Sequence, residues 1–540
     1  MKNHTEPAAI WDEYQRGKSY KQAVNLYNNV EDNENFYLGN QWEGVNVQNI
    51  PKPVINFIKR SVAYFTATII SDDISIQLQP FASDDATEKL MRVFSRDVDR
   101  ILENDKTRTK FREVLRNAAV DGDGVIYWRW DTEVKTGQTA EGDVRSDVLS
   151  NINVHFGNPY DRNVQAQPYI IIAQRIPLGM VRDEAKENGV KDVDIIVSDT
   201  DPYQREKGGE SDLVTVLTKL WKDPKTKTVH AQKTTHNVVI RKDWDTLCTL
   251  YPIAWMSWDR VQNSYHGQAA VTGIIPNQIT VNKLMAMYVK SVEMNAFPKI
   301  VYDGTKIKNW SNRVGEAIKV MGAVDQTAVN VLRGGDTSAQ VMEVIQALIT
   351  LTRDAVGAND AALGNINPEQ ASGNAIIATT QANAAPLELQ RQDYFDLVEQ
   401  CVLIILDHMA AYYGTREAAF ENDETAIDPM TGAQVQSQPT VQAVDYTQIR
   451  ELVKQTNVSI GSSAYWSELA QMQTMDNLLQ AGIIQDTVLY LESIPDKWLP
   501  NKQALIDSAK QMQAQQQQMM AGSMMQQPMQ DYDAMLDGAL

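Results

Sequence analysis

Cysteine is almost absent from this 540-residue sequence, which contains only Cys248 and Cys401. Two cysteines about 150 positions apart give neither a metal-ligand spacing nor a disulfide framework, so we expect two buried, reduced thiols. The six histidines are scattered and form no His-x-x-x-His or Cys/His cluster, which argues against structural zinc. We therefore predict no metal and no cofactor.

Long hydrophobic runs are also missing. The longest candidate, around Val402 to Leu406, lies between Gln400 and Asp407 and is far shorter than the ~20 apolar residues that cross a bilayer. The first residues, Met1 to Glu6, lack the apolar segment of a secretory signal. We expect no membrane span and a protein that stays in the cytoplasm where it is made.

Basic charge is in short supply as well. Lysine and arginine total 50 against 69 aspartates and glutamates, which gives a formal net charge of −19. Proteins that read DNA sequence are usually basic because phosphate neutralisation supplies much of their affinity, so a repressor or nuclease is disfavoured. An acidic surface suits DNA that must slide past without sticking, but simple solubility explains the charge equally well.

Common enzyme signatures are absent too. The sequence has no G-x-x-x-x-G-K-[ST], G-x-G-x-x-G, G-x-S-x-G or H-E-x-x-H. Acidic pairs such as Asp121/Asp123 and Asp201/Glu206 are expected by chance in a chain with 69 acids. We predict no catalytic residue and no enzyme, and we keep a hydrolase with an unrecognised acidic site as a remote alternative.

What is present is a change from strands to helices along a chain too long for one core. A helix of about Asp85 to Ala119 is followed by Asp121–Gly124, which we interpret as a helix-to-strand turn because a calcium loop would need further oxygen ligands. The period-two and β-rich segments predict these strands: Ile74–Pro80, Val125–Trp130, Asn151–Phe156, Tyr169–Arg175, Leu213–Lys222 and Val229–Arg241. Asn35–Trp42 is predicted to be an aromatic loop.

From Gly267 onward the pattern predicts helices around a small insert. One helix has Pro276 in its first turn and stops before Phe297. Pro386 lies inside a very long helix and should kink it. The other elements we expect are these: strands Lys299–Asp303 and Val329–Leu332, helices Trp310–Lys319, Thr337–Val356 and Asn374–Tyr413, helical residues 464–510, and a Gln/Met-rich tail from Gln511.

Three segments carry a family resemblance. Trp258 to Lys283 contains a His266-Gly267 turn that leads into a helix bearing Gln and Asn. Gly364 to Ile376 reads Asn-Pro, then Ser-Gly-x-Ala, ahead of the longest helix, and Phe36 to Trp42 reads F-Y-L-G-N-Q-W. In content and order these segments resemble the portal proteins of tailed bacteriophages, over roughly residues 30 to 510.

The resemblance implies an α+β portal fold with a β-rich wing, a two-helix stem, a small α/β clip, a long kinked wing helix and a helical crown, assembled as a ring. It implies the following division: an N-terminal arm (1–30), wing (31–266), first stem helix (267–297), clip (298–336), second stem helix (337–357), tunnel loop (358–373), long wing helix (374–413), returning wing (414–463), crown (464–510) and tail (511–540).

The family forms a ring of about twelve subunits at one capsid vertex, through which double-stranded DNA is packaged and ejected. The implied partners are further copies of the chain, the terminase large subunit, the major capsid protein with its scaffold, and head-completion adaptor or tail proteins. The implied location is the virion, with assembly in the host cytoplasm. The alternative is another phage structural protein, a capsid or tail-tube subunit, which would be dominated by β-sheet.

Two sets of side chains are candidates for the DNA channel. Lys283 and Lys290 are seven apart and therefore share one helix face. The small, flexible loop Gly357–Gly373 carries amides that hydrogen-bond phosphate weakly, while Asp360 and Glu369 would repel it. The amide candidates are Asn359, Asn365, Asn367 and Gln370.

Residues 266–320 carry seven bases against three acids in a chain that is acidic overall. This excess indicates contact with DNA phosphates or with an acidic partner, and local fluctuation of charge on a solvated face is the plain alternative. For partner docking at the clip we single out Lys306, Lys308, Trp310 and Arg313.

Overall fold

The computed structural model describes residues 5–70, 73–80, 85–138, 140–201, 212–297, 299–311, 313, 318–322, 329–332, 339–355, 357, 385–420, 425–427, 434–436, 440–453, 456–463, 506 and 508. It mixes helix and sheet, as an α+β protein does. The chain divides into two compact units, residues 1–71 with 75–461 and residues 72–74 with 462–540. Almost all of the described residues belong to the first unit, and the predicted crown and tail lie almost wholly outside the described residues.

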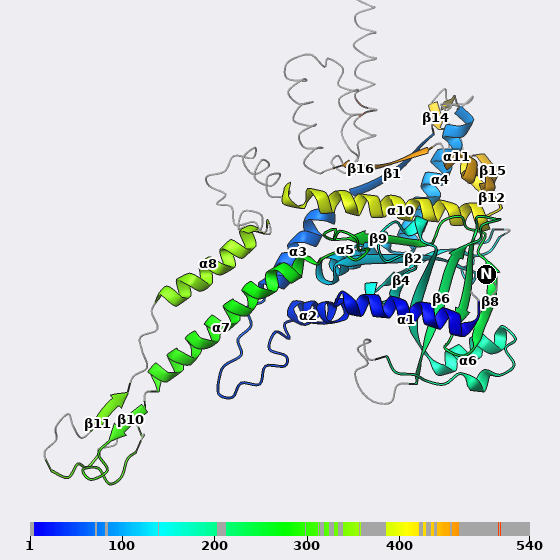
Figure 1. Ribbon diagram of the computed structural model, residues 1–540. Coiled ribbons are helices and arrows are strands. Elements are labelled where there is room, and N and C mark those ends of the chain that lie inside the picture. The colour runs from blue at the N-terminus through cyan, green and yellow to red at the C-terminus, as the bar shows by residue number, and fades with distance from the viewer. Residues whose placement is uncertain are drawn as a thin grey trace, which may run out of the picture. The chain divides into compact units, whose positions relative to one another are not determined.

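Two antiparallel sheets form the centre of the first unit (Figure 1). The five-stranded sheet has the order β4-β5-β6-β7-β8 and the three-stranded sheet the order β3-β2-β9. The predicted strand Val229–Arg241 is two strands. The bounds are β2 Asp123–Asp131, β3 Asp143–Leu149, β4 Val154–Phe156, β5 Tyr169–Pro177, β6 Leu213–Lys222, β7 Val229–Thr234, β8 Val239–Asp245 and β9 Ile253–Ser257.

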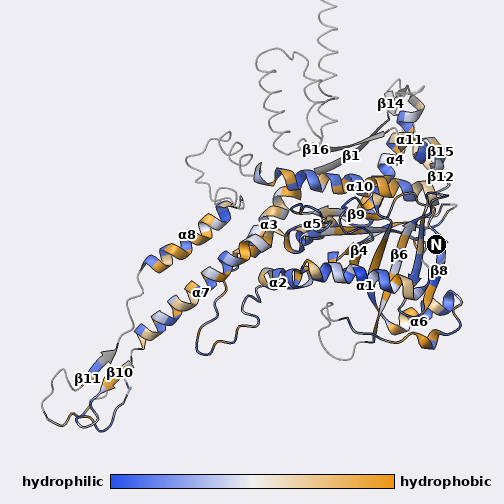
Figure 2. Ribbon diagram, in the orientation of Figure 1, coloured by the Kyte–Doolittle hydropathy of each residue, from blue (hydrophilic) through white to orange (hydrophobic). Residues whose placement is uncertain are grey.

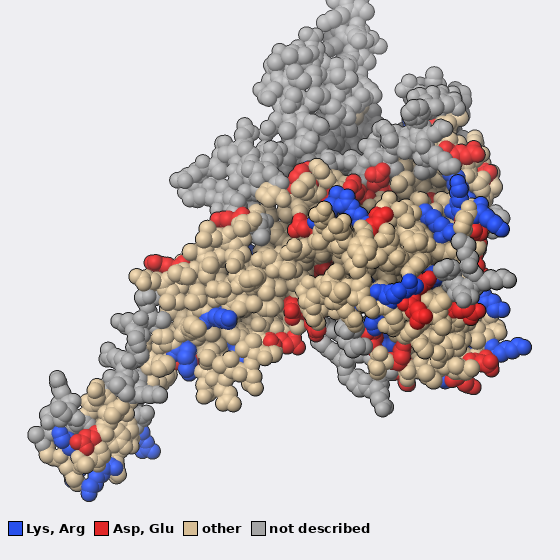
Figure 3. Space-filling view, viewed as in Figure 1, with Lys and Arg blue, Asp and Glu red and all other residues tan. Residues whose placement is uncertain are grey.

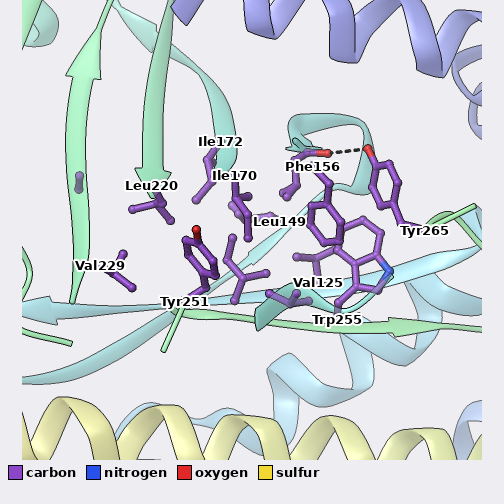
Figure 4. Packing of buried hydrophobic residues seen from close by; sticks show 14 residues of the cluster. Val125, Leu149, Phe156, Ile170, Ile172, Leu220, Val229, Tyr251, Trp255 and Tyr265 are labelled. Atoms are coloured by element: carbon purple, nitrogen blue, oxygen red, sulfur yellow. Dashed lines mark hydrogen bonds between the residues drawn. The ribbon is translucent and has the colours of Figure 1, made fainter. Parts of the chain in front are cut away.

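The main hydrophobic core lies between these two sheets (Figure 4). Phe156 and Tyr265 stack with ring centroids 4.4 Å apart, and the Tyr265 hydroxyl donates to the Val154 carbonyl at 3.3 Å. β5 supplies Ile170 and Ile172 to this core and Ile171 to the opposite face, since successive side chains of a strand alternate. The middle of the five-stranded sheet is therefore buried on both faces.

Helices cover the outer faces of the sheets. α1 (Pro7–Ala23) packs Ile10 and Tyr14 against the face of the five-stranded sheet opposite the core. α10 (Glu388–Tyr412) packs against β9 and β2, where Trp130 stacks on Tyr412 at 4.8 Å. His408, in the predicted core stripe of this helix, is buried and bonds the Ile404 carbonyl. The remaining described elements of this part are α2 Leu26–Leu38, α3 Phe57–Ile70, α6 Leu178–Glu187, α11 Ile449–Val453, β1 Asp73–Pro80 with β16 Thr456–Ser463, β12 Thr415–Phe420 with β15 Thr440–Asp445, and β13 Thr425–Ile427 with β14 Gln434–Gln436.

The predicted helix Asp85–Ala119 is in fact two helices, α4 (Asp85–Asn104) and α5 (Thr107–Asp121). The first ends at Asn104, and Lys106, with a φ of 53°, precedes the second as its N-cap. Asp105 accepts the backbone N–H of Ser146 at 3.1 Å and pairs with Lys110 at 2.7 Å. The break is stabilised by these distant partners, so helical periodicity alone did not reveal it.

Other local expectations also change. Residues 35–38 of the predicted aromatic loop belong to α2, which ends at Leu38. Pro386 lies in a 3₁₀ turn, Ala385–Leu387, immediately before α10, where a missing N–H costs no helical bond. The part of the predicted long helix from 374 to 384 is outside the described residues, so a kink at this proline stays a prediction.

Beyond the sheets, α7 (Ala270–Ala296) extends with α8 (Ala339–Ala355) beside it, and the antiparallel hairpin of β10 (Lys299–Tyr302) and β11 (Val329–Leu332) follows α7 (Figure 1). Pro276 is inside α7, which begins six residues before it. The residues described within the predicted helix Trp310–Lys319 are irregular. We call the first unit without residues 270–357 the body, and α7 with α8 the helix pair.

Candidate functional site

The helix pair leaves the body at a turn built around a buried carboxylate. Asp123 lies at the start of β2, after the predicted helix-to-strand turn at Gly122, whose φ is 99°. It accepts hydrogen bonds from the Ser257 hydroxyl at 2.7 Å and the Gly267 N–H at 2.8 Å, and it pairs with His266 Nδ1 at 2.7 Å. Burial lowers the pKa of His266, although Asp123 opposes this effect.

Two glycines make this turn possible. A Cβ on Gly122 would lie 2.7 Å from the Gly267 carbonyl oxygen, and a Cβ on Gly267 would lie 2.9 Å from the Gly122 carbonyl oxygen. No side chain fits between these two backbones. The His-Gly pair in the family-like segment thus fixes the point at which α7 begins.

A second polar cluster holds the first half of α7. Gln278 is fully buried; its amide donates to the Ile55 carbonyl at 2.8 Å and its oxygen accepts the Phe57 N–H at 3.3 Å. Asn282, one turn later, donates to the Gln41 side chain at 2.6 Å. The Gln and Asn of the resemblance are therefore structural ties between α7 and residues 41–57.

The partners of α7 divide its surface into three faces. One face carries the ties just described. A second faces α8, because Asn277 donates to the Thr352 hydroxyl at 2.9 Å. At 100° per residue the third face contains Lys283, Met287, Lys290 and Met294, which follow one another at helical spacing. We call these four residues the lysine–methionine stripe.

The stripe is open to solvent. Met287 is 65% exposed and Met294 is 45% exposed, although both are large apolar side chains. Lys283 is exposed, and Lys290 makes an exposed pair with Glu293 at 3.2 Å. Figure 2 shows hydrophobic residues continuing along both helices beyond the body. Exposed apolar residues in a row indicate a surface that a partner covers.

α8 has an open apolar face of its own. Val344 and Leu351 are seven residues apart, so they share a face, and they are 49% and 66% exposed. Ile345 and Thr352 are buried on the side toward α7. The helix pair is thus packed internally but uncovered outside.

The hairpin region carries a small pocket. Tyr302 and Trp310 stack with centroids 5.3 Å apart. The pocket, about 250 Å³, is lined by Lys308, Asn309, Trp310, Ser311, Ile318, Lys319 and Met321. Trp310 and the two lysines in its lining suit an acidic partner with an apolar anchor. Figure 3 shows lysine and arginine on both the helix pair and the hairpin.

The predicted site residues are partly brought together. Lys283 and Lys290 do share a face, and Lys308 and Trp310 do line one pocket, whereas Lys306 and Arg313 lie in the same region outside its lining. The candidates Asn359, Asn365, Asn367 and Gln370 lie outside the described residues. The sequence did not lead us to select Met287 and Met294 as site residues, although their spacing relative to the lysines was the available signal.

The acidic pairs considered as catalytic candidates have structural partners. Asp123 accepts the hydrogen bonds of the turn described above. Asp201 accepts a hydrogen bond from the Tyr14 hydroxyl at 3.1 Å and pairs with Lys18 at 3.0 Å. Glu206 lies outside the described residues. In the part of the chain that the structure describes, no group of three or more His, Cys, Asp or Glu is placed to hold a metal ion. Among the described helices, none combines the length and apolarity that a bilayer crossing demands.

No protein-family model matches this sequence, and no curated protein sequence matches it.

Proposed function

We propose that this chain is the portal protein of a tailed bacteriophage, a ring subunit whose central channel passes double-stranded DNA into and out of the capsid. The order of parts supports the proposal: a body of sheets and helices, α7, a hairpin, α8 beside α7, and the long helix α10 back across the body. Capsid and tail-tube subunits, the alternative class, would be dominated by sheet, whereas the described chain places a helix pair around an insert.

The observation that carries the proposal is the uncovered helix pair. Beyond the first half of α7, which is tied to the body, the two helices have each other as their main packing partner, and they expose Met287, Met294, Val344 and Leu351. In a ring, these exposed surfaces are covered by the two neighbouring copies. Closed rings arise when one surface of a subunit binds a different surface of the next, which leaves a central hole.

The chemistry of the channel follows from the stripe. At 100° per residue the lysines lie on one edge of the stripe and the methionines on the other, so Lys283 and Lys290 would face phosphates in the channel while Met287 and Met294 meet a neighbouring copy. The chain as a whole carries a net charge of −19. A few weak, salt-sensitive phosphate contacts within an acidic ring guide DNA without holding it. The ring acts as a conduit and a platform; we assign nucleotide hydrolysis to the terminase motor that docks on it.

Partners are assigned to surfaces in the same proposal. The hairpin pocket with Lys308 and Trp310 receives the terminase during packaging and head-completion or tail proteins afterwards. The body faces the capsid protein and scaffold at one vertex. The protein is placed in the virion, and in the host cytoplasm during assembly.

Assembly state tests the proposal most directly. The purified chain should form a ring of about twelve copies with a central hole, visible by negative-stain microscopy and weighed by native mass spectrometry. A variant with Met287→Ser and Met294→Ser should stay folded and lose the ring. Met180→Ser, at an apolar residue 65% exposed on the body, is the matched control and should assemble normally. A wild-type chain that remains a compact monomer under all conditions contradicts the proposal.

A further inference from the structure

A long loop, residues 39–56, leaves the body beside α7 (Figure 1). Its two ends are tied to each other, because the Trp42 indole donates to the Pro53 carbonyl at 2.9 Å. They are also tied to the body and to α7: Asn56 donates to the Tyr37 carbonyl at 2.9 Å, and Gln41 accepts from Asn282. The base of the loop is therefore fixed in place.

The outer part of the loop is exposed and apolar. All eight residues from 43 to 50 are exposed, and among them Val45, Val47 and Ile50 are 39%, 41% and 43% exposed. Surface loops are normally polar and rich in turn residues. Three β-branched aliphatic side chains held out from a fixed base indicate a contact with another molecule.

The loop also has internal order. The Lys52 ammonium donates to the Val45 carbonyl at 2.7 Å, and the Val45 N–H donates to the Trp42 carbonyl at 3.2 Å. Its only charged residues are Glu43 and Lys52, so it carries no net charge. A partly ordered, neutral, aliphatic loop suits an apolar protein surface and gives no grip on DNA phosphates.

The outer face of α8 offers such a surface on a different side of the same helix pair. On α7, Gln278 and Asn282 contact the loop, whereas Asn277 contacts α8. At 100° per residue these directions differ by roughly 100–140°. Figure 1 shows the loop on one side of α7 and α8 on the other.

We propose that the 39–56 loop of one copy docks on the outer face of α8, at Val344 and Leu351, in the next copy. The two surfaces are different and lie on different sides of one subunit, so the contact is head-to-tail and repeats around a ring; a single shared patch would instead give a two-fold dimer. This inference rests on the proposed ring and names the contact that joins its members.

Disulfide cross-linking tests the contact in the full-length chain. Val47→Cys and Leu351→Cys are made in separately tagged chains and co-expressed, with little background because Cys248 and Cys401 are buried. Oxidation should give a disulfide-linked dimer that contains both tags and joins positions 47 and 351. Neither variant alone should give this dimer. Val197→Cys, at a body residue 60% exposed, replaces Val47→Cys in the control and should give no link to residue 351.

A second variant tests whether the contact matters for assembly. Val45→Ser, Val47→Ser and Ile50→Ser together should reduce ring formation at least tenfold at a fixed concentration, with unchanged near-UV circular dichroism. Ile195→Ser with Val197→Ser is the control, because these side chains are also about half exposed but lie on the body. Raising the salt concentration should change the assembly little, since the contact is apolar.

The outcomes separate the two proposals. Rings that form without the cross-link, and that persist in the triple variant, overturn the loop contact and leave the portal function standing. A cross-link between two copies of the Val47→Cys chain alone would show a two-fold loop contact and would also overturn the inference. The absence of any ring in the wild type overturns both.

Discussion

The body and the helix pair differ in where their charged and apolar side chains lie. Inside the body, ions are buried and paired: Lys219 and Glu13 lie 2.6 Å apart with almost no exposure, and the Lys21 ammonium donates to three backbone carbonyls. On the helix pair, apolar side chains face outward and lysines are open. Apart from the 39–56 loop, the polar interior of the body finds its partners within one chain, whereas the helix pair has apolar surface without a partner among the described residues.

This difference separates stability from function. Buried polar groups are expensive to leave unpaired, so substitutions in the body should cost folding free energy. Substitutions on the open faces of the helix pair should cost almost none and act on assembly or DNA passage instead.

Asp123→Ala should give the largest loss, about 4 kcal/mol of unfolding free energy, because it leaves the Ser257 hydroxyl, the Gly267 N–H and His266 without their acceptor. Denaturant unfolding followed by tryptophan fluorescence measures it. The control is Asp147→Ala at the exposed pair with Arg129, which should cost less than about 1 kcal/mol. Equal losses in the two variants would remove the distinction between buried and exposed acids.

Gly122→Ala should cost about 3 kcal/mol, because it adds a 2.7 Å clash with the Gly267 carbonyl to the strain of a positive φ. Gly137→Ala is a matched control: its φ is 70° and nothing lies within 4 Å of the added Cβ. The control should cost only about 1 kcal/mol. Thermal unfolding of both variants measures the difference, and a cost at Gly122 no greater than at Gly137 would argue against the close approach.

Acid should destabilise the body through its buried histidines. Burial, then the positive charge of Lys21, holds the pKa of His155 well below its usual value. The unfolded chain, with a histidine pKa of about 6.5, therefore binds more protons, and the unfolding free energy falls as the pH drops below that value.

His155→Gln should flatten this slope by up to about 1.4 kcal/mol per pH unit, measured by unfolding between roughly pH 7 and 5. His236→Gln, at an exposed histidine, is the matched control for replacing a histidine. An unaltered slope in the His155 variant would assign the acid sensitivity to other groups.

Lys283→Glu with Lys290→Glu should change the unfolding free energy by less than about 0.5 kcal/mol, because both side chains are solvent-accessible. Packaged genomes should nevertheless fall at least tenfold in a complementation assay, with rings still formed. Lys225→Glu with Lys227→Glu, at exposed lysines of the body, is the control and should package normally. Normal packaging in the Lys283/Lys290 variant would show that the lysine–methionine stripe does not line the DNA channel.

Much of the fold followed from the sequence because it depends on local pattern. The bounds of β6 and β11 agree with the predicted strands, α8 agrees within two residues, and the turn at Asp121–Gly124 is confirmed. The departures arise where distant partners decide. Asp105 ends α4 through Ser146, and α7 tolerates Pro276 in its interior while Gln278 and Asn282 tie it to other segments.

The candidate site was predictable only in outline. Lysines seven apart define a shared face from the sequence alone, but the exposure of Met287 and Leu351 depends on which sides α7 and α8 turn toward each other. Likewise, valine and isoleucine at positions 45, 47 and 50 do not by themselves indicate a binding surface. The structure shows that they are exposed beyond the fixed base of the 39–56 loop.

The turn at Gly122 and Gly267 has a consequence for the proposed ring. Because two backbones touch there and Asp123 holds both β2 and the start of α7, the tilt of α7 is set by the interior of the body. Identical copies must then present their helices at one common inclination. In the proposed ring, the angular step between neighbours, and with it the number of copies that closes the circle, would then depend on one buried carboxylate and two glycines of the body.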